Sequence, residues 1–296
     1  MRNLFVYAVC GDRHAGLVNR SLQFLKHFSR QDILIVVSRC NVPIHHDQII
    51  WTDSSDEFDD HQVSILLKTN LYRIIGEPPV RCCYLDSDVI AIDPHVDTIF
   101  SRKLGPISFS VDHVRMRRFS PWAVQCGCVG GECDHLREAI RRKFGIEVLE
   151  PNWQHWNGGV YVFDSESIDF LDTWHAYTRL IFCDSAWTTR DQGTLIASAW
   201  RHGLENQAPL PRAYNYIVDR PNVVGRAGRT SLRPCGYPIC GEYPLDQPSD
   251  LPRTHFLHFI NGSMDALGRN RGWIQYFRSL VEDDGGRRDV AHKSEK

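Results

Sequence analysis

The chain has 296 residues, of which 42% are hydrophobic and 24% are charged. These proportions are ordinary for a folded domain and exclude a disordered or fibrous protein. The formal net charge of −2 gives no electrostatic footprint for nucleic acid and no general attraction to an anionic membrane. We expect residues 1–282 to form one domain and the charged residues 283–296 to form a disordered tail.

No run of about eighteen apolar residues occurs, so the sequence predicts no transmembrane helix. The apolar opening, Leu4 to Cys10, is short for a secretory signal and lacks a small-residue cleavage site. We therefore expect a cytoplasmic protein, either free or peripheral to the inner face of a membrane.

The first third of the chain predicts a βαβ unit followed by a loop and a helix. Residues 4–10 and 33–37 are continuous apolar runs typical of buried strands, and residues 17–28 between them have helical spacing. Strand, helix and strand in this order form the repeating unit of a parallel sheet. Residues 51–60 are rich in Asp and Ser and predict a surface loop, and residues 63–75 predict one further helix.

The remaining elements complete an α/β pattern. Strands are expected at residues 107–111, 159–163 and 254–260, and helices at 133–144, 167–181 and 191–200. The segment 206–252 is rich in Pro, Gly and Arg and predicts an irregular excursion. The fold class is therefore a single Rossmann-like α/β domain with a mixed, mainly parallel central sheet.

Two carboxylates, Asp86 and Asp88, interrupt the apolar run from Cys82 to Ile92. Burying them is unfavourable unless a positive partner neutralises them. In a parallel sheet, ligands bind beyond the carboxyl ends of the strands, and residues two apart on a strand face the same side. Both carboxylates can therefore reach one cation, and oxygen ligands suit Mg²⁺ or Mn²⁺ completed by substrate phosphates.

Two other interpretations of the Asp pair stay open. The pair could start a simple turn, or Asp86 could be the nucleophile of an aspartyl-phosphate phosphatase, whose motif also ends a strand. That phosphatase motif normally lies on the first strand and continues to Thr or Val two residues after the second Asp. Here Ile90 stands at that place, and a full βαβ unit comes first.

Four segments carry a resemblance to a known family. They are YLDSDVIAID (84–93), WNGGVYVF (156–163), DQGTL from Asp191 and LHFIN from Leu257. In this order and approximate spacing they resemble glycosyltransferase family eight, which includes glycogenin and lipopolysaccharide galactosyltransferases. The resemblance spans residues 4 to about 262 and implies a GT-A fold. It also implies transfer of a hexose from a UDP-sugar, with retention, to an unidentified carbohydrate, lipid-linked or protein acceptor; a catalytically silent nucleotide-sugar-binding protein is the remaining alternative.

The resemblance also assigns residues to the donor site. It implies that Asp86, Asp88 and His258 ligate Mn²⁺ or Mg²⁺, with His255 as the competing ligand, and that Asp86 also belongs to the donor-binding set. Further donor contacts fall on Ala8, Val9, Asp12, Lys68, Gly158 and Gly262. Asn261 stands where the family has a glycine, and Gly262 follows it, which is a departure from the family pattern.

The same resemblance implies three catalytic positions. Asn157 matches a residue that contacts the donor sugar or the acceptor, beside glycines that permit close approach. Asp191 and Gln192 fall beside the anomeric carbon, where they would position the sugar and stabilise charge. The alternative for Asp191 is a helix cap.

Two further groups stand apart from these motifs. Cys126, Cys128, Cys133 and His135 are ligand types that zinc accepts, although free thiols in a Gly-rich loop are the alternative, and Cys235 and Cys240 could join them. Trp153, His155 and Trp156 could form an aromatic platform for an acceptor sugar or pack in the core. We expect the remaining cysteines, Cys10, Cys40, Cys82, Cys83 and Cys183, to be buried thiols.

Overall fold

The computed structural model describes residues 2–76, 80–128, 131–188, 190–218, 254–260 and 271–282. The expected tail at 283–296, the larger part of the segment 206–252, and Gly262 lie outside the described residues, as do Cys235 and Cys240.

The expected βαβ unit opens the chain. Strand β1 (Arg2–Cys10) and strand β2 (Asp32–Ser38) flank helix α1 (Asp12–Phe28) and pair in parallel, with Val6 opposite Leu34. Strand β3 (Ile49–Trp51) extends the sheet beyond β2, also in parallel. Strand β4 (Val80–Leu85) pairs in parallel with the other edge of β1, so β1 occupies the interior of the sheet.

Two later strands complete the central sheet. Strand β7 (Trp156–Phe163) runs antiparallel to β4, and β6 (Ser108–Val111) runs antiparallel to β7. The six strands have the order β3-β2-β1-β4-β7-β6, and β7 is the strand that opposes the direction of the others. The expected mixed, mainly parallel α/β fold is therefore confirmed.

A small second sheet lies beside the end of β4. It consists of β5 (Val89–Ala91), β9 (Phe256–Phe259) and β8 (Tyr216–Val218), with β9 in the middle. β5 follows β4 after a turn of three residues, Asp86 to Asp88. The chain thus passes from one sheet to the other through the acidic turn.

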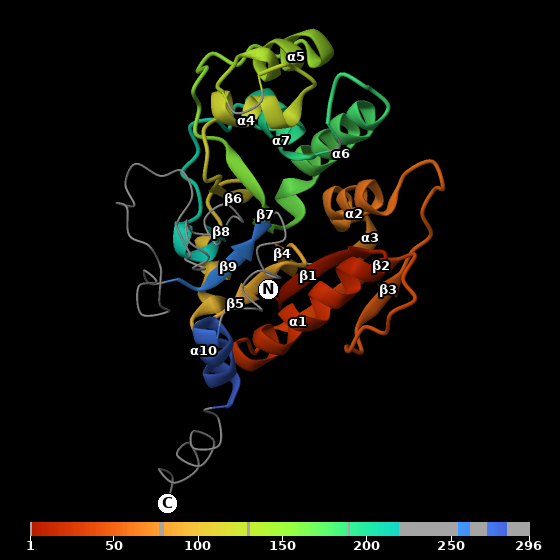
Figure 1. Ribbon diagram of the computed structural model, residues 1–296, viewed down its shortest axis with the longest axis vertical. Helices are drawn as coiled ribbons and strands as arrows, with labels where there is room; N and C mark the ends of the chain where they lie inside the picture. Colours follow the sequence, from red (N-terminus) through yellow and green to blue (C-terminus); the bar gives the residue numbers. More distant parts are fainter. Residues whose placement is uncertain are drawn as a thin grey trace, which may run out of the picture.

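Apolar side chains cover both faces of the central sheet. Alternate residues of β1 enter opposite clusters: Val6 and Ala8 pack on one side, and Phe5, Tyr7 and Val9 on the other. Helix α1 covers the face of Tyr7, whereas α2 (Asp60–Thr69) and α6 (Ile168–Phe182) cover the face of Val6, as Figure 1 shows. A strand buried on both faces reads as a continuous apolar run, which is why β1 was predictable.

The remaining elements cap the upper end of the view in Figure 1. They are α4 (Met116–Ala123), α5 (His135–Phe144) and α7 (Gln192–Arg201), which pack together there. Helix α10 (Arg271–Glu282) lies at the opposite end. Short 3-10 turns occupy Val96–Arg102, Ser165–Ser167 and Arg212–Tyr214.

Several sequence-based boundaries were wrong. The helix expected over 63–75 is two helices, α2 and α3 (Leu71–Ile75), because Asn70 leaves the helical conformation between them. Helix α4 was not predicted, and the segment 206–252, expected to be irregular, contains β8. Of the cysteines expected to be buried, Cys183 is exposed and Cys40 is only partly buried.

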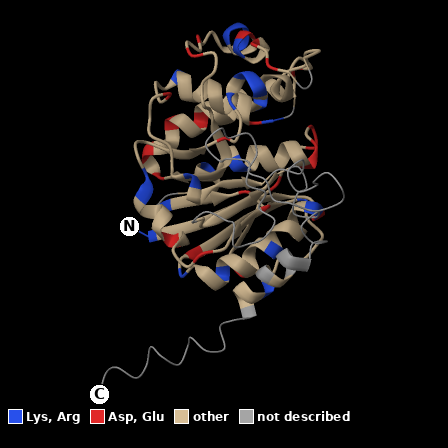
Figure 2. Ribbon diagram, turned by 60° about the vertical axis from the view of Figure 1, so that its left-hand side comes forward, with Lys and Arg blue, Asp and Glu red and all other residues tan. Residues whose placement is uncertain are grey.

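Acidic and basic residues are interspersed over the ribbon in Figure 2. None of the helices among the described residues combines the length and the apolarity needed to cross a membrane.

Candidate active site

The acidic pair lies in a turn that joins the two sheets. Strand β4 ends at Leu85, and Asp86 to Asp88 turn the chain into β5. The backbone N–H of Asp86 donates to the carbonyl of Gly159 over 2.8 Å, and Phe259 N–H donates to the carbonyl of Asp88 over 3.0 Å. The expectation that strand alternation aligns the two carboxylates was therefore wrong: the turn aligns them, and β7 and β9 hold the turn.

His258 completes the acidic pair. Its position on β9 is fixed by pairing with Val89 of β5 and Ile217 of β8. Its ring Nε2 lies 3.6 Å from Asp86 Oδ2 and 3.4 Å from Asp88 Oδ1. One ligand atom from each of the three residues lies within 4.8 Å of the others, so one ion can contact all three.

The competing histidine points elsewhere. His255 Nδ1 lies 2.9 Å from Asp93 Oδ1, and no ligand group of the described residues joins it to Asp86 and Asp88. His258 is the third residue after His255, so along an extended chain the two side chains face opposite sides. The structure therefore places His258, not His255, with the acidic pair.

Asn215 orients the His258 ring. Its Oδ1 lies 3.0 Å from His258 Nδ1, while its Nδ2 donates to Asn157 Oδ1 over 3.0 Å. Because the amide nitrogen faces Asn157, the amide oxygen faces the ring and accepts the proton of Nδ1. The unprotonated Nε2 then faces the carboxylates, which is the arrangement that metal-ligating histidines use.

The pKa values of His258 and Asp86 reflect both their burial and the charges around them. Burial lowers the pKa of His258, but the Asp88 and Asp86 carboxylates raise it, and the net value is above the ordinary one. Burial raises the pKa of Asp86, but Lys68 and His258 lower it below the ordinary value. Asp86 therefore stays ionised and available to a cation.

Lys68 lies between two carboxylates. Its Nζ is 2.8 Å from Asp191 Oδ2 and 3.4 Å from Asp86 Oδ1, and the side chain is 6% exposed. Burial lowers the pKa of Lys68, but Asp191 and Asp86 raise it above the ordinary value, so the ammonium persists. Lys68 is thus a buried part of the site.

Two glycines of β7 let the chain pass close to the site. A Cβ on Gly159 would lie 2.1 Å from His258 Cε1 and 2.9 Å from Asp86 Oδ2. A Cβ on Gly158 would lie 3.1 Å from Lys68 Nζ and 3.2 Å from Asp191 Oδ2. The space that a side chain would fill at position 159 is occupied by the proposed ligands themselves.

Two of the three expected catalytic residues, Asn157 and Gln192, meet at Asp112. Asn157 Nδ2 donates to Asp112 Oδ2 over 2.9 Å, and Gln192 Nε2 donates to the same oxygen. Asp191 precedes α7 but makes no side-chain capping bond; its carboxylate pairs with Lys68 instead. Asp191 is therefore the N-cap residue of α7 by position, as the alternative had it, while its carboxylate serves the ion pair with Lys68.

Asp112 was missed by the sequence reading. It follows β6 directly, and His113 Nδ1 lies 2.9 Å from its Oδ1. Burial raises the pKa of Asp112, but His113, His155 and the hydrogen bond from Asn157 lower it well below the ordinary value. A carboxylate at the end of a strand was the available signal, because the same argument identified Asp86.

One continuous hydrogen-bonded chain therefore links the two halves of the site. It runs from His258 through Asn215 and Asn157 to Asp112 and Gln192. The Asn157 oxygen also accepts the backbone N–H of Gly159 over 2.8 Å. The residues that face the proposed metal and those beside Gln192 are thus held in one fixed arrangement.

Of the other residues predicted at the donor site, two are buried in a strand, one holds a neighbouring loop, and one lies outside the described residues. Ala8 and Val9 lie near the carboxyl end of β1, and their buried side chains belong to the core. The Asp12 carboxylate accepts the backbone N–H groups of Asn41 and Val42 over 2.7 and 3.0 Å. Gly262 lies outside the described residues.

Of the two alternatives for the aromatic group before β7, the structure shows core packing and not an acceptor platform. Trp153, His155 and Trp156 are all buried, and the Trp156 ring stacks on Phe109 with centroids 5.4 Å apart. No face of these rings is free for a sugar, because the fold uses them to pack the core.

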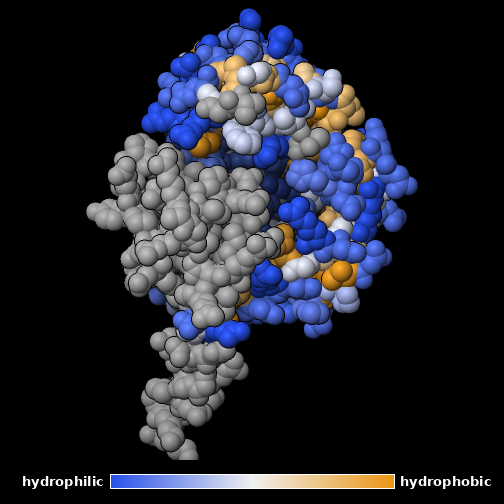
Figure 3. Space-filling model, in the orientation of Figure 1, coloured by the Kyte–Doolittle hydropathy of each residue, from blue (hydrophilic) through white to orange (hydrophobic). Residues whose placement is uncertain are grey.

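The cluster fits a divalent cation of the Mn²⁺ or Mg²⁺ type. Two carboxylates and one imidazole converge, the outer ring nitrogen is hydrogen-bonded, and the hard oxygen ligands match these ions. Three protein ligands leave positions for phosphate oxygens. In Figure 3 the surface is hollowed near its centre, and the described residues around the hollow are mostly hydrophilic.

The fold resembles solved glycosyltransferase structures. WbbM, a bifunctional glycosyltransferase, aligns over 94% of this chain and 51% of its own, with 11% identity and a TM-score of 0.52. The galactosyltransferase LgtC, in complex with donor and acceptor sugar analogues, aligns over 96% of each chain with 12% identity and a TM-score of 0.51. An active-site mutant of LgtC aligns over 96% of each chain with 10% identity and a TM-score of 0.52.

These likenesses establish the fold, and the expected GT-A fold is confirmed. The chain spans about half the length of WbbM. No protein-family model matches the chain, and no curated protein matches it. Membership of family eight therefore stays a prediction.

Proposed function

We propose that the protein is a metal-dependent glycosyltransferase that moves a hexose from a UDP-sugar to an acceptor with retention of anomeric configuration. The observation that carries this proposal is the convergence of Asp86, Asp88 and His258 within 4.8 Å, linked by hydrogen bonds to Asn157 and Gln192. The GT-A fold supports it, because sites of this fold class lie where the strands end.

Asp86, Asp88 and His258 would hold Mn²⁺ or Mg²⁺, which supplies charge neutralisation to the diphosphate as it departs. The protein residues do the remaining work. Lys68 neutralises part of the charge of Asp86 and Asp191 and keeps both carboxylates in place. Asn215 keeps the Nε2 of His258 facing the acidic pair.

Asp191, Gln192 and Asn157 are the proposed contacts to the transferred sugar. Asp112 draws the Gln192 and Asn157 amide nitrogens toward itself, so the Gln192 amide oxygen is left for the electron-poor anomeric carbon. An amide oxygen can stabilise positive charge that develops there, which is electrostatic stabilisation by a preorganised dipole. Gly158 lies beside Asp191, and its lack of a side chain lets β7 pass close to that carboxylate.

The uridine end of the donor is proposed at the end of β1, where Ala8, Val9 and Asp12 lie. Asp12 contributes there by holding Asn41 and Val42. Gly262 keeps its proposed donor contact as a prediction. The acceptor, which is a carbohydrate, a lipid-linked molecule or a protein, and the expected cytoplasmic or membrane-peripheral location are likewise untested predictions.

Donor hydrolysis tests the proposal directly. With Mn²⁺ and a panel of UDP-sugars, the wild-type protein is expected to release UDP slowly, and Asp86→Asn and Asp88→Asn are expected to release none. An aspartyl-phosphate phosphatase would instead release inorganic phosphate from phosphomonoesters. A silent binding protein would show stabilisation by a nucleotide sugar but no UDP release. Either of these last two outcomes overturns the proposal.

A further inference from the structure

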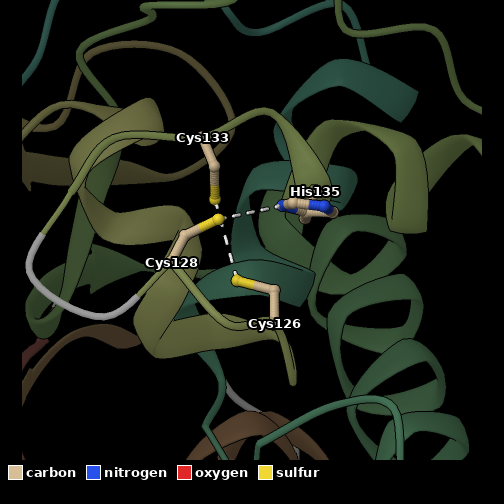
Figure 4. A group of neighbouring side chains, drawn as sticks. All are labelled: Cys126, Cys128, Cys133 and His135. Carbon is tan, nitrogen blue, oxygen red and sulfur yellow. Dashed lines mark hydrogen bonds between the residues drawn. The ribbon is translucent and has the colours of Figure 1, made fainter.

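A second group of metal-ligating side chains lies outside the proposed active site. Cys126 and Cys128 lie in the loop after α4, Cys133 lies just before α5, and His135 is the first residue of α5. Figure 4 shows the four side chains pointing toward one another. One ligand atom from each lies within 4.8 Å of the others.

The distances match the edges of a zinc tetrahedron. Zn–S bonds of about 2.3 Å and Zn–N bonds of about 2.0 Å place tetrahedral ligand atoms roughly 3.5–3.8 Å apart. Cys126 Sγ lies 3.8 Å from Cys133 Sγ, and Cys128 Sγ lies 3.8 Å from His135 Nδ1. A single disulfide would account for two of the three thiols and would leave the histidine unexplained.

We propose that Cys126, Cys128, Cys133 and His135 bind one structural Zn²⁺ ion. On binding, the three thiols release their protons to solvent and the neutral imidazole binds through Nδ1. The four protein ligands fill the tetrahedron, so no position is left for water or substrate. A closed site of this kind stabilises a fold and does not catalyse.

The backbone around the cluster shows what the ion would stabilise. Cys133 N–H donates to the carbonyl of Arg117 in α4 over 3.1 Å, and Leu136 N–H donates to Ser120 Oγ over 2.9 Å. The ion would therefore tie the end of α4 to the start of α5.

The same loop reaches the segment before the proposed catalytic residues. Gln125 N–H donates to the carbonyl of Ala186, and Thr188 N–H donates to the carbonyl of Ala123, over 2.8 and 2.9 Å. Leu136 Cδ1 lies 3.3 Å from the place of a Cβ on Gly193, the residue after Gln192. The ion would thus brace the start of α7 from outside the active site.

Metal analysis of the purified full chain tests the proposal. Protein purified without a chelator is expected to contain one equivalent of zinc, as measured by inductively coupled plasma mass spectrometry. Cys128→Ser and His135→Ala are expected to lose it, whereas Cys183→Ser, which changes an exposed cysteine elsewhere, should keep it. Asp86→Asn combined with Asp88→Asn should also keep the zinc, which separates this site from the proposed catalytic one.

Cobalt substitution gives a second readout if a variant fails to fold. Wild-type protein loaded with Co²⁺ is expected to show thiolate-to-cobalt charge transfer and the intense visible bands of tetrahedral cobalt. Octahedral cobalt spectra, zinc that survives Cys128→Ser, or a disulfide between two of these cysteines in freshly purified protein would each overturn the proposal.

Discussion

Gly159 and His258 are in such close contact that no side chain fits between them. A Cβ on Gly159 would lie 2.1 Å from His258 Cε1, well inside contact distance, although the two residues are far apart in sequence. The close approach follows from the two sheets meeting at the acidic turn, where β7 supplies Gly159 and β9 supplies His258.

Gly159→Ala is therefore expected to displace His258 and to abolish Mn²⁺ binding. Gly158→Ala is the matched control, because a Cβ there meets Lys68 Nζ at 3.1 Å and its three nearest contacts include none of the three proposed ligands, so it should weaken Mn²⁺ affinity much less. Calorimetric titration of both variants with MnCl₂ measures the difference. Equal Mn²⁺ affinities in the two variants would show that the close contact of Gly159 with His258 is not needed for metal binding.

Asn215→Ala is expected to weaken Mn²⁺ binding about 10- to 100-fold, the usual effect of removing the partner of a metal-ligating histidine. Asn215→Asp keeps an oxygen acceptor for His258 Nδ1 but loses the donor to Asn157 Oδ1, so it should retain more affinity than Asn215→Ala. The comparison uses the same titration. A loss of affinity in Asn215→Asp as large as in Asn215→Ala would contradict the orienting role.

Lys68→Met should destabilise the protein by about 3–5 kcal/mol, because it leaves the buried carboxylate of Asp191 and the partly buried one of Asp86 without their ammonium partner. Lys68→Arg keeps the charge and should cost less. Urea unfolding of both variants measures the free energy of unfolding. A Lys68→Met variant as stable as the wild type would mean that the ion pairs contribute no net stability.

Asp112→Asn is expected to lower turnover of a UDP-sugar about 100-fold while leaving Mn²⁺ affinity unchanged. The reason is that the variant has a single amide oxygen, which cannot accept both from Asn157 and Gln192, which donate to Oδ2, and from the Val114 N–H, which donates to Oδ1. Asp164→Asn, which changes another buried carboxylate that pairs with Lys103, is the control and should keep normal turnover per folded molecule. Unchanged turnover in Asp112→Asn would show that Asp112 is not needed to hold Asn157 and Gln192 for catalysis.

His155 should make the protein less stable in mild acid. Burial lowers the pKa of His155 below its ordinary value near 6.5, so the unfolded chain binds a proton that the folded chain excludes. The contribution of neutral His155 is complete above about pH 6.5 and is lost as the pH falls below it, by at most about 1.4 kcal/mol per pH unit.

The variant His155→Asn lacks the part of the pH dependence of stability that His155 contributes. The free energy of unfolding of this variant should decline less steeply than that of the wild type between pH 7 and 5, as measured by urea unfolding at several pH values. Parallel curves for the two proteins would show that His155 does not titrate on unfolding.

Local patterns in the sequence predicted most of the helices and strands and the two acidic residues of the site. Apolar runs indicated β1, β2 and β7 because both faces of those strands are buried. Helical spacing indicated α1 and α6. The two acids inside an apolar run marked Asp86 and Asp88, since a charge is tolerated there only with a partner. Short elements such as β3, β8 and α4 carry too few residues for a period to be visible.

Tertiary structure alone decided which distant residues complete the site. The pairing of Val89 with His258, and not periodicity, puts His258 rather than His255 beside the acidic turn. Asn215 and Asp112 enter the same hydrogen-bonded chain from strands and turns far along the sequence. The sheet register that brings these groups together is set by the packing of the whole core, whereas a sequence pattern reports only which face of its own helix or strand is buried.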